Sequence, residues 1–255
     1  MTLNESRGNM YEFITHTWNP IKGKCFHDCA YCYMKGMVPN PKPIHIVESE
    51  LKGTFPDNSF IFIDSSADLF AEDVESEWIK KVLDFCVEGT NHSQEQNKAR
   101  FLVQTKNPKR ILDFIDHPIF SKERKQAVVC TTIETNRHYP EIMNNAPLPQ
   151  DRAKAMAEIS KHGIPTYVTI EPIIDFDLDE LVSLIKLFKP EQVNIGKDSK
   201  NIVELPSPGW KKLVLLILQL LCFTKVNIKK NIDGKKVIKA LDIWINNISI
   251  ESKVR

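Results

Sequence analysis

The chain has 255 residues, of which 42% are hydrophobic and 26% charged, and its formal net charge is +1. This is ordinary globular composition for one large or two small domains, and the near-neutral charge of the whole chain indicates neither a nucleic-acid nor a membrane partner. The longest apolar run, residues 213–223, is too short to span a bilayer, and no segment resembles a secretory signal, so we expect a cytoplasmic protein.

The N-terminal part of the chain leads into one short strand. Residues 1–10 are polar and show no periodicity, so we expect a flexible end. Residues 13–18 predict a strand that ends before Pro20, because proline cannot pair within a sheet. A long loop follows, in which Gly23 and Gly36 supply backbone freedom.

This loop carries three cysteines within eight residues, as Cys25-Phe-His-Asp-Cys29-Ala-Tyr-Cys32. Thiolates are the usual ligands of iron–sulfur clusters, and a four-iron cluster held by three of them keeps one iron open to a substrate. The alternative is structural zinc, which would need a fourth ligand such as His16 or His27 because no second cysteine pair is present. The odd number of thiols in this region argues against a disulfide.

Short apolar strands alternate with amphipathic helices along the rest of the chain. The predicted strands are 60–63, 101–103, 127–130, 167–170 and 193–195. The predicted helices are 76–87, 108–115, 151–159, a segment capped by Asp177 and Glu180, and an apolar segment after Trp210. Such alternation predicts parallel βα units, and with the first strand there are six. A last short strand is predicted near residues 226–228.

Polar residues follow each predicted strand, at the ends where an α/β barrel carries its active site. They are Asp64 to Asp68, Gln104 to Lys106, Thr131 to Glu134, Glu171, and Lys197 with Asp198. We therefore expect these strand ends to share one cavity. The predicted fold class is α/β, a partial (β/α)6 TIM-type barrel of parallel strands. We divide the chain into a flexible N-terminus (1–10), the barrel (11–224) and a basic C-terminal extension packed on it (225–255).

Six stretches, taken in order, resemble the spore photoproduct lyase branch of the radical S-adenosylmethionine (SAM) superfamily. They are also similar to a phage-associated three-cysteine family of unknown function. The stretches are Thr17 to Pro20, Cys25 to Cys32, Asp64 to Phe70, Thr105 to Pro108, Thr131 to Glu134, and Pro149 to Arg152. The resemblance implies a six-stranded partial barrel, a [4Fe–4S] cluster bound by Cys25, Cys29 and Cys32, and SAM as cosubstrate.

The resemblance also implies which residues meet SAM. It assigns the amino group to Ser65 and Ser66, the carboxylate to Lys106, the ribose to Thr132 and Glu134, and the adenine to Tyr31. Two alternatives stay open from the residues themselves. Lys106 is either this ligand or an exposed loop cation, and Glu134 and Glu171 would equally serve to hold each other's loops by hydrogen bonds.

The function implied is that of a radical SAM enzyme of lyase or transferase type. It would cleave SAM reductively to a 5′-deoxyadenosyl radical and abstract hydrogen from a large substrate, with nucleic acid as the first candidate. An external one-electron donor such as flavodoxin or ferredoxin is expected. The chain lacks a cysteine placed as the hydrogen donor of spore photoproduct lyase, which argues against spore photoproduct repair. It also lacks a second cysteine cluster, which argues against sulfur insertion.

The charge distribution motivates the nucleic-acid hypothesis. From Lys211 onward there are ten Lys and Arg against three Asp and Glu, whereas the preceding residues carry 24 against 30. Lysines gather around a predicted turn at Asp233-Gly234; they are Lys225, Lys229, Lys230, Lys235, Lys236 and Lys239. They form either a phosphate-binding surface or a solubilising one. The alternative functions are modification of a peptide or protein, and a non-catalytic iron–sulfur or zinc-binding interaction module.

Overall fold

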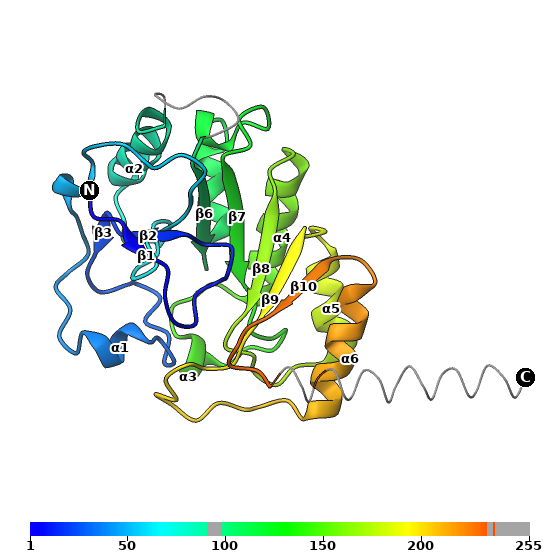
Figure 1. Cartoon of the computed structure of the whole chain (residues 1–255). Coiled ribbons are helices and arrows are strands. Elements are labelled where there is room, and N and C mark those ends of the chain that lie inside the picture. The colour runs from blue at the N-terminus through cyan, green and yellow to red at the C-terminus, as the bar shows by residue number, and fades with distance from the viewer. Residues whose placement is uncertain (91–97, 234–236, 238–255) are drawn as a thin grey trace, which may run out of the picture.

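The computed structural model describes residues 1–90, 98–233 and 237 (Figure 1). Eight strands form one open sheet in the order β1-β2-β5-β6-β7-β8-β9-β10. Their bounds are Asn4–Glu5, His16–Trp18, Phe60–Ile63, Arg100–Thr105, Ala127–Thr132, Thr166–Ile170, Gln192–Ile195 and Lys225–Ile228. All neighbouring pairs are parallel except β1 with β2 at one edge. The predicted partial barrel of parallel strands is confirmed, and its seven parallel strands are the six of the βα units and the last short strand predicted near residues 226–228.

Helices connect these strands. Among the described residues, the α-helices are α1 (Met34–Met37), α2 (Ser76–Glu88), α3 (Pro140–Met143), α4 (Pro149–Lys161), α5 (Leu178–Lys186) and α6 (Trp210–Leu221). The same residues include 3-10 helices at Glu48–Glu50, Pro108–Phe114 and Pro118–Phe120, and a two-stranded ribbon of β3 (Ile21–Lys22) with β4 (His45–Ile46). No helix of the described part of the chain is long and apolar enough to cross a membrane.

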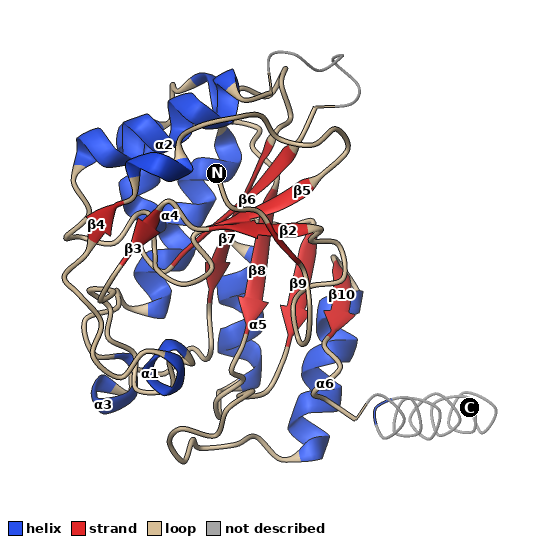
Figure 2. Ribbon diagram, turned by 60° about the vertical axis from the view of Figure 1, so that its left-hand side comes forward, coloured by secondary structure: helices blue, strands red, loops and turns tan. Residues whose placement is uncertain are grey.

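The outer face of the sheet holds the main core. Alternate strand residues such as Ile61, Val129 and Val193 point to this face and are completely buried. They pack against the apolar faces of α2, α4, α5 and α6, which lie around the outside of the sheet (Figure 2). Full burial of one such side chain contributes about 1.5–3 kcal/mol, so this layer supplies much of the driving force for the fold.

The inner face of the sheet is filled by the N-terminal segment, which crosses the front of the sheet in Figure 1. Tyr11 is buried there beside Phe62 and Leu102, and its hydroxyl donates to Gln104 Oε1 at 3.0 Å. Residues 1–10, for which the sequence predicts a flexible end, contribute strand β1 and a hydrogen bond from Asn9 to Glu171. Strand β1 pairs with the nearby β2, whereas Glu171, the partner of Asn9, lies far along the chain, where the local pattern does not reveal it.

Two local predictions, a helix type and a helix cap, differ from the structure, and a third, the last strand, agrees with it. The helix predicted at 108–115 is a 3-10 helix, Pro108–Phe114. Asp177 is the N-cap of α5, but its side chain makes no cap bond, because its carboxylate accepts from the Arg137 guanidinium. The last predicted strand is present as β10. Within the predicted C-terminal extension, residues 234–236 and 238–255 lie outside the described residues, and they include Lys235, Lys236 and Lys239.

Candidate functional site

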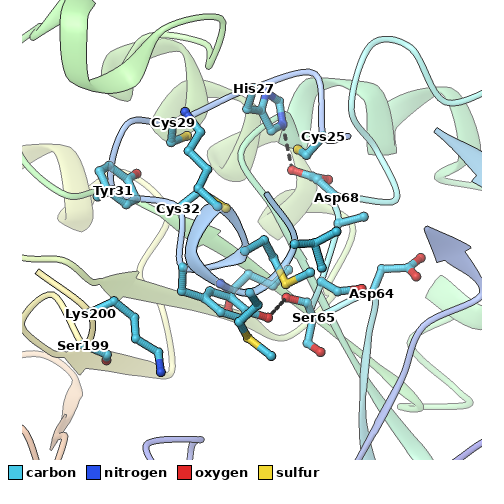
Figure 3. Close-up of a pocket in the computed structure, with 18 of the residues that line it drawn as sticks. Cys25, His27, Cys29, Tyr31, Cys32, Asp64, Ser65, Asp68, Ser199 and Lys200 are labelled. Carbon is cyan, nitrogen blue, oxygen red and sulfur yellow. Dashed lines mark hydrogen bonds and ion pairs between the residues drawn. The ribbon is translucent and has the colours of Figure 1, made fainter. Parts of the chain in front are cut away.

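The carboxyl ends of the parallel strands open into one cavity of about 1240 Å³ (Figure 3). The three motif cysteines line it together with residues at the ends of six strands, β5 to β10. The residues predicted from the sequence that line it are Tyr31 of the cysteine loop and, at the strand ends, Ser65, Ser66, Lys106, Thr132, Glu171, Lys197 and Asp198. The expectation that these strand ends share a cavity with the cysteine loop is therefore confirmed. Glu134 is the one predicted residue whose side chain lies below the cavity wall, with no exposed surface.

The cysteine loop is fixed at its start by a close backbone approach. Gly23 has φ +121°, and a Cβ atom there would lie 2.4 Å from the carbonyl oxygen of Pro43. The neighbouring Lys24 amide donates to Lys42 O at 2.8 Å. Only glycine can take this conformation and leave room for the opposing chain. Further along, Ala30 N donates to Ile142 O, which ties the loop to α3.

The three thiols differ in exposure, with Cys29 buried and Cys25 and Cys32 partly exposed. Burial raises the pKa of the Cys25 thiol, and the nearby Asp68 carboxylate raises it further. Burial likewise raises the pKa of Cys29. Thiolates at these positions therefore need a positive partner, which a metal centre supplies.

The donor set fits an iron–sulfur cluster better than a single metal ion. A closed zinc site needs four protein ligands, and the cysteine loop brings three thiols to the cavity. A cubane cluster places each thiolate on a different iron, so three separated thiols around one cavity suit it. His27 Nδ1 is an additional buried polar atom at this wall that has no hydrogen-bond partner within the described structure.

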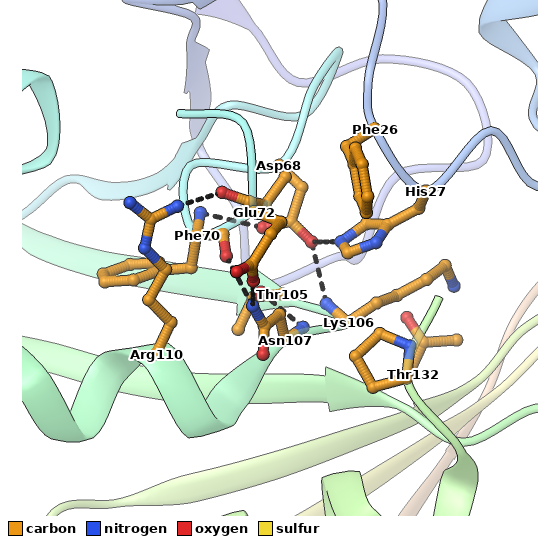
Figure 4. A network of polar contacts seen from close by, with 12 residues as sticks. Phe26, His27, Asp68, Phe70, Glu72, Thr105, Lys106, Asn107, Arg110 and Thr132 are labelled. Carbon is orange, nitrogen blue, oxygen red and sulfur yellow. Dashed lines mark hydrogen bonds and ion pairs between the residues drawn. The ribbon is translucent and has the colours of Figure 1, made fainter. Parts of the chain in front are cut away.

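Asp68, in the loop after β5, holds the cysteine loop through His27 (Figure 4). Its Oδ2 accepts from His27 Nε2 at 2.8 Å and from the Lys106 backbone amide at 2.8 Å. Its other oxygen accepts from the Phe70 amide. Burial opposes ionisation of Asp68, but His27 and these donors lower its pKa overall, so the carboxylate is charged.

Glu134, after β7, is a second buried carboxylate under the same loop. It accepts a hydrogen bond from the Tyr31 hydroxyl and forms ion pairs with Lys106 Nζ at 2.7 Å and Arg152 Nη1 at 2.8 Å. Burial opposes its ionisation, yet Arg152 and Lys106 hold its pKa far below the usual range. The sequence left open the alternative that Glu134 holds loops together by hydrogen bonds, and its contacts have this character. Its partners, however, are Tyr31, Lys106 and Arg152, and not Glu171 or its loop.

Ser65 and Ser66 are arranged by an asparagine from the Trp-Asn-Pro stretch. Asn19 Oδ1 accepts from Ser65 Oγ, Ser66 Oγ and the Ser66 amide, at 3.0–3.1 Å. The Tyr33 hydroxyl donates to the Ser65 carbonyl at 2.6 Å. This wall presents hydroxyl groups and aromatic surface next to Cys32, a composition able to meet a polar small molecule.

A second polar cluster lies at the ends of β8 and β10. Lys229 Nζ pairs with Glu171 Oε2 at 2.7 Å, and its ammonium lies 4.6 Å from the centre of the Tyr11 ring. Lys229, predicted as a phosphate contact, is thus held largely inside by Glu171. Burial raises the pKa of Glu171, and the Lys229 charge opposes that shift.

Sequence reasoning assigned no role to Asn19, Asp68 or Arg152, three residues that shape this site. A signal for them existed, because each lies inside a stretch that carries the family resemblance. Their role is visible only in three dimensions, because each acts on a loop 18 to 47 residues away.

Comparison with known proteins bears on the fold. No family model matches the chain, and no curated protein sequence matches it significantly. Among solved structures, a double mutant of spore photoproduct lyase with bound AdoMet and dinucleoside spore photoproduct superposes with a TM-score of 0.63 at 10% identity. The match covers 87% of this chain and 78% of that one. A single mutant of the same enzyme gives 0.62 at 11% identity, with equal coverage. The resemblance to spore photoproduct lyase is thus confirmed at the level of the fold.

Proposed function

We propose that this chain is a radical SAM enzyme of lyase or transferase type that acts on a large substrate, nucleic acid in the first place. One observation carries the proposal. The three thiols of a Cys-x₃-Cys-x₂-Cys loop line a cavity at the carboxyl ends of a parallel sheet that has the spore photoproduct lyase fold. When bound, a [4Fe–4S] cluster supplies the electron that cleaves SAM to a 5′-deoxyadenosyl radical able to abstract hydrogen.

Different residues of the chain are proposed to bind the cluster and SAM. Cys25, Cys29 and Cys32 would bind the cluster. For SAM, the proposed contacts are Ser65 and Ser66 for the amino group, Lys106 for the carboxylate, Thr132 for the ribose and Tyr31 for the adenine. Because the Glu134 side chain has no exposed surface, the ribose contact passes to Thr132, and Glu134 instead orients Tyr31 and Lys106. An external one-electron donor such as flavodoxin or ferredoxin completes the proposal.

The size and lining of the cavity support a large substrate. Its volume of about 1240 Å³ exceeds the range of about 300–1,000 Å³ that is usual for a single small-molecule site, which leaves room beside SAM. One wall carries exposed apolar surface from Tyr33, Met37 and Val38. Such surfaces stack unpaired bases without sequence preference.

Cations at the cavity mouth support a polyanionic substrate. Lys42, Lys197 and Lys200 line the cavity and are exposed, and none has an ion-pair partner within the described part of the chain. Lysines of this kind hold phosphates and make binding steeply dependent on salt. The solved relative also carries a dinucleoside spore photoproduct. Cys86, Cys130 and Cys222 do not line the cavity, so the outcome of the reaction is expected to differ from a repair that needs a cysteine hydrogen donor.

A filter-binding titration tests the substrate class. Single-stranded and duplex DNA and RNA would be compared at rising salt, with the wild-type chain and a variant in which Lys42, Lys197 and Lys200 are replaced by Glu. The matched control changes three exposed lysines remote from the cavity, Lys80, Lys154 and Lys161, to Glu. We expect the salt dependence to weaken by about one unit of slope for each lost phosphate contact, in the cavity variant only.

Two outcomes of the titration would contradict a nucleic-acid substrate. No affinity at low salt, or equal losses in the cavity and control variants, would rule out nucleic acid held at this mouth. A peptide or protein substrate would then be the better proposal, since the same cavity admits an extended chain.

A further inference from the structure

Two side chains between the motif cysteines are anchored to buried carboxylates. His27 lies between Cys25 and Cys29 and bonds Asp68, and Tyr31 lies between Cys29 and Cys32 and bonds Glu134. His27 is 3% exposed and Tyr31 8% exposed, so both bonds are shielded from water. Buried hydrogen bonds to charged groups are stronger than exposed or neutral ones.

Both carboxylates also contact Lys106, at the end of β6. The Lys106 amide donates to Asp68, and the Lys106 ammonium pairs with Glu134. The loop that carries the thiols and the strand end proposed to meet the SAM carboxylate are therefore tied to the same two anchors. In Figure 4 the His27 ring and the Lys106 backbone meet Asp68 from different sides.

We propose that His27 and Tyr31 are positioning residues that fix the cysteine loop through Asp68 and Glu134, and that His27 is not itself a metal ligand. The proposal rests on the proposed function for the identity of the bound group, but the loop contacts exist without it. His27 uses Nε2 for Asp68, which leaves only Nδ1 without a partner in the described structure, and the three motif thiols already supply the ligands that the proposed cluster needs. Groups behind the ligands of a metal site typically change its affinity for metal when they are replaced.

Hydrogen exchange of the full-length, cluster-free protein tests the anchoring directly. His27→Phe keeps a planar aromatic ring, slightly larger than imidazole, but removes the bond to Asp68, so amides 25–32 should exchange about tenfold faster, as expected for loss of a bond to a charged group. His27→Gln can still donate to Asp68 and should restore exchange to within about twofold of wild type. The control His162→Phe, at the exposed end of α4, should change nothing.

Iron binding then separates a positioning role from a ligand role. After anaerobic reconstitution, His27→Gln should retain wild-type iron, whereas His27→Phe should hold less than half as much. If His27→Gln loses iron as completely as Cys25→Ala, His27 is a ligand and the proposal is wrong. If His27→Phe exchanges like wild type, or His27→Gln exchanges like His27→Phe, the anchor does not hold the loop and the proposal is also wrong.

A milder variant keeps the test decisive if His27→Phe does not fold. Tyr31→Phe removes only a hydroxyl, and it should accelerate exchange of the same amides while leaving strands β6 and β7 protected. Unchanged exchange in Tyr31→Phe would then refute the anchoring. If the wild-type protein takes up no iron, the proposed function fails, and the exchange results alone decide the role of these anchors.

Discussion

Replacement of Glu134 by Ala should destabilise the protein by about 3–5 kcal/mol, the usual loss when one partner of a buried ion pair is removed. Arg152 is the reason, because its guanidinium has no exposed surface and would be left without a counter-charge. Its bonds to the carbonyls of Thr132 and Pro147 would remain and hold the charge inside. Lys106 is 16% exposed and can turn toward the cavity, so it adds less to the loss.

Urea unfolding at pH 7 measures this prediction. The matched control is Glu158→Ala, which breaks an exposed pair with Lys161 on α4 and should change stability by less than about 1 kcal/mol. Replacing Arg152 by Met in the Glu134→Ala background should recover much of the loss, because no charge then stays buried alone. If the free energy of unfolding of Glu134→Ala lies within about 1 kcal/mol of that of the control, Glu134 is not the charged partner that stabilises Arg152 in the core.

The same pair predicts a pH dependence of definite sign. The folded-state pKa of Glu134 lies below its ordinary value of 4.5, because Arg152 and Lys106 outweigh the effect of burial. Its stabilising contribution is therefore complete above that value and is lost as the pH falls below it. The stability advantage of wild type over Glu134→Gln should shrink in acid. An advantage that stays constant from pH 7 to pH 3 would contradict the assignment.

Three further predictions concern the loop and its cofactors. Replacing any motif cysteine by Ala should abolish the brown colour and the binding of about four irons per chain in anaerobic protein, whereas Cys86→Ala should not. Gly23→Ala should destabilise the chain more in urea than Gly53→Ala, since both have positive φ but only Gly23 faces a backbone oxygen at 2.4 Å; equal losses would exclude the clash. Asn19→Ala should weaken SAM binding to reconstituted protein about tenfold in equilibrium dialysis, because it removes the acceptor that orients Ser65 and Ser66. Unchanged affinity would show that Asn19 plays no part in SAM binding.

The fold was predictable because its signals are local. The apolar run at 60–63 is β5, and the polar residues that follow it line the cavity as expected. Parallel strands buried on both faces read as short continuous apolar runs, and their carboxyl ends meet at one edge. The three-cysteine spacing is also a local signal, and all three cysteines line the cavity.

The supporting contacts were not predictable, because they join distant segments. Nothing near Asn9 in the sequence points to Glu171, and nothing near Glu134 points to Tyr31. The prediction that Glu134 contacts the ribose followed from the family resemblance, which assigns the end of the fourth strand to that role. Its burial follows from Arg152, which reaches it from α4. Residues that hold a site together carry no spacing signature of their own.

Release of 5′-deoxyadenosine tests the central claim most directly. Anaerobically reconstituted protein would be mixed with SAM and a strong one-electron reductant, and the nucleoside would be quantified by chromatography and mass spectrometry. The account predicts 5′-deoxyadenosine from wild type and none above background from Cys29→Ala. Wild-type protein that binds stoichiometric zinc, takes up no iron and releases no 5′-deoxyadenosine would contradict it.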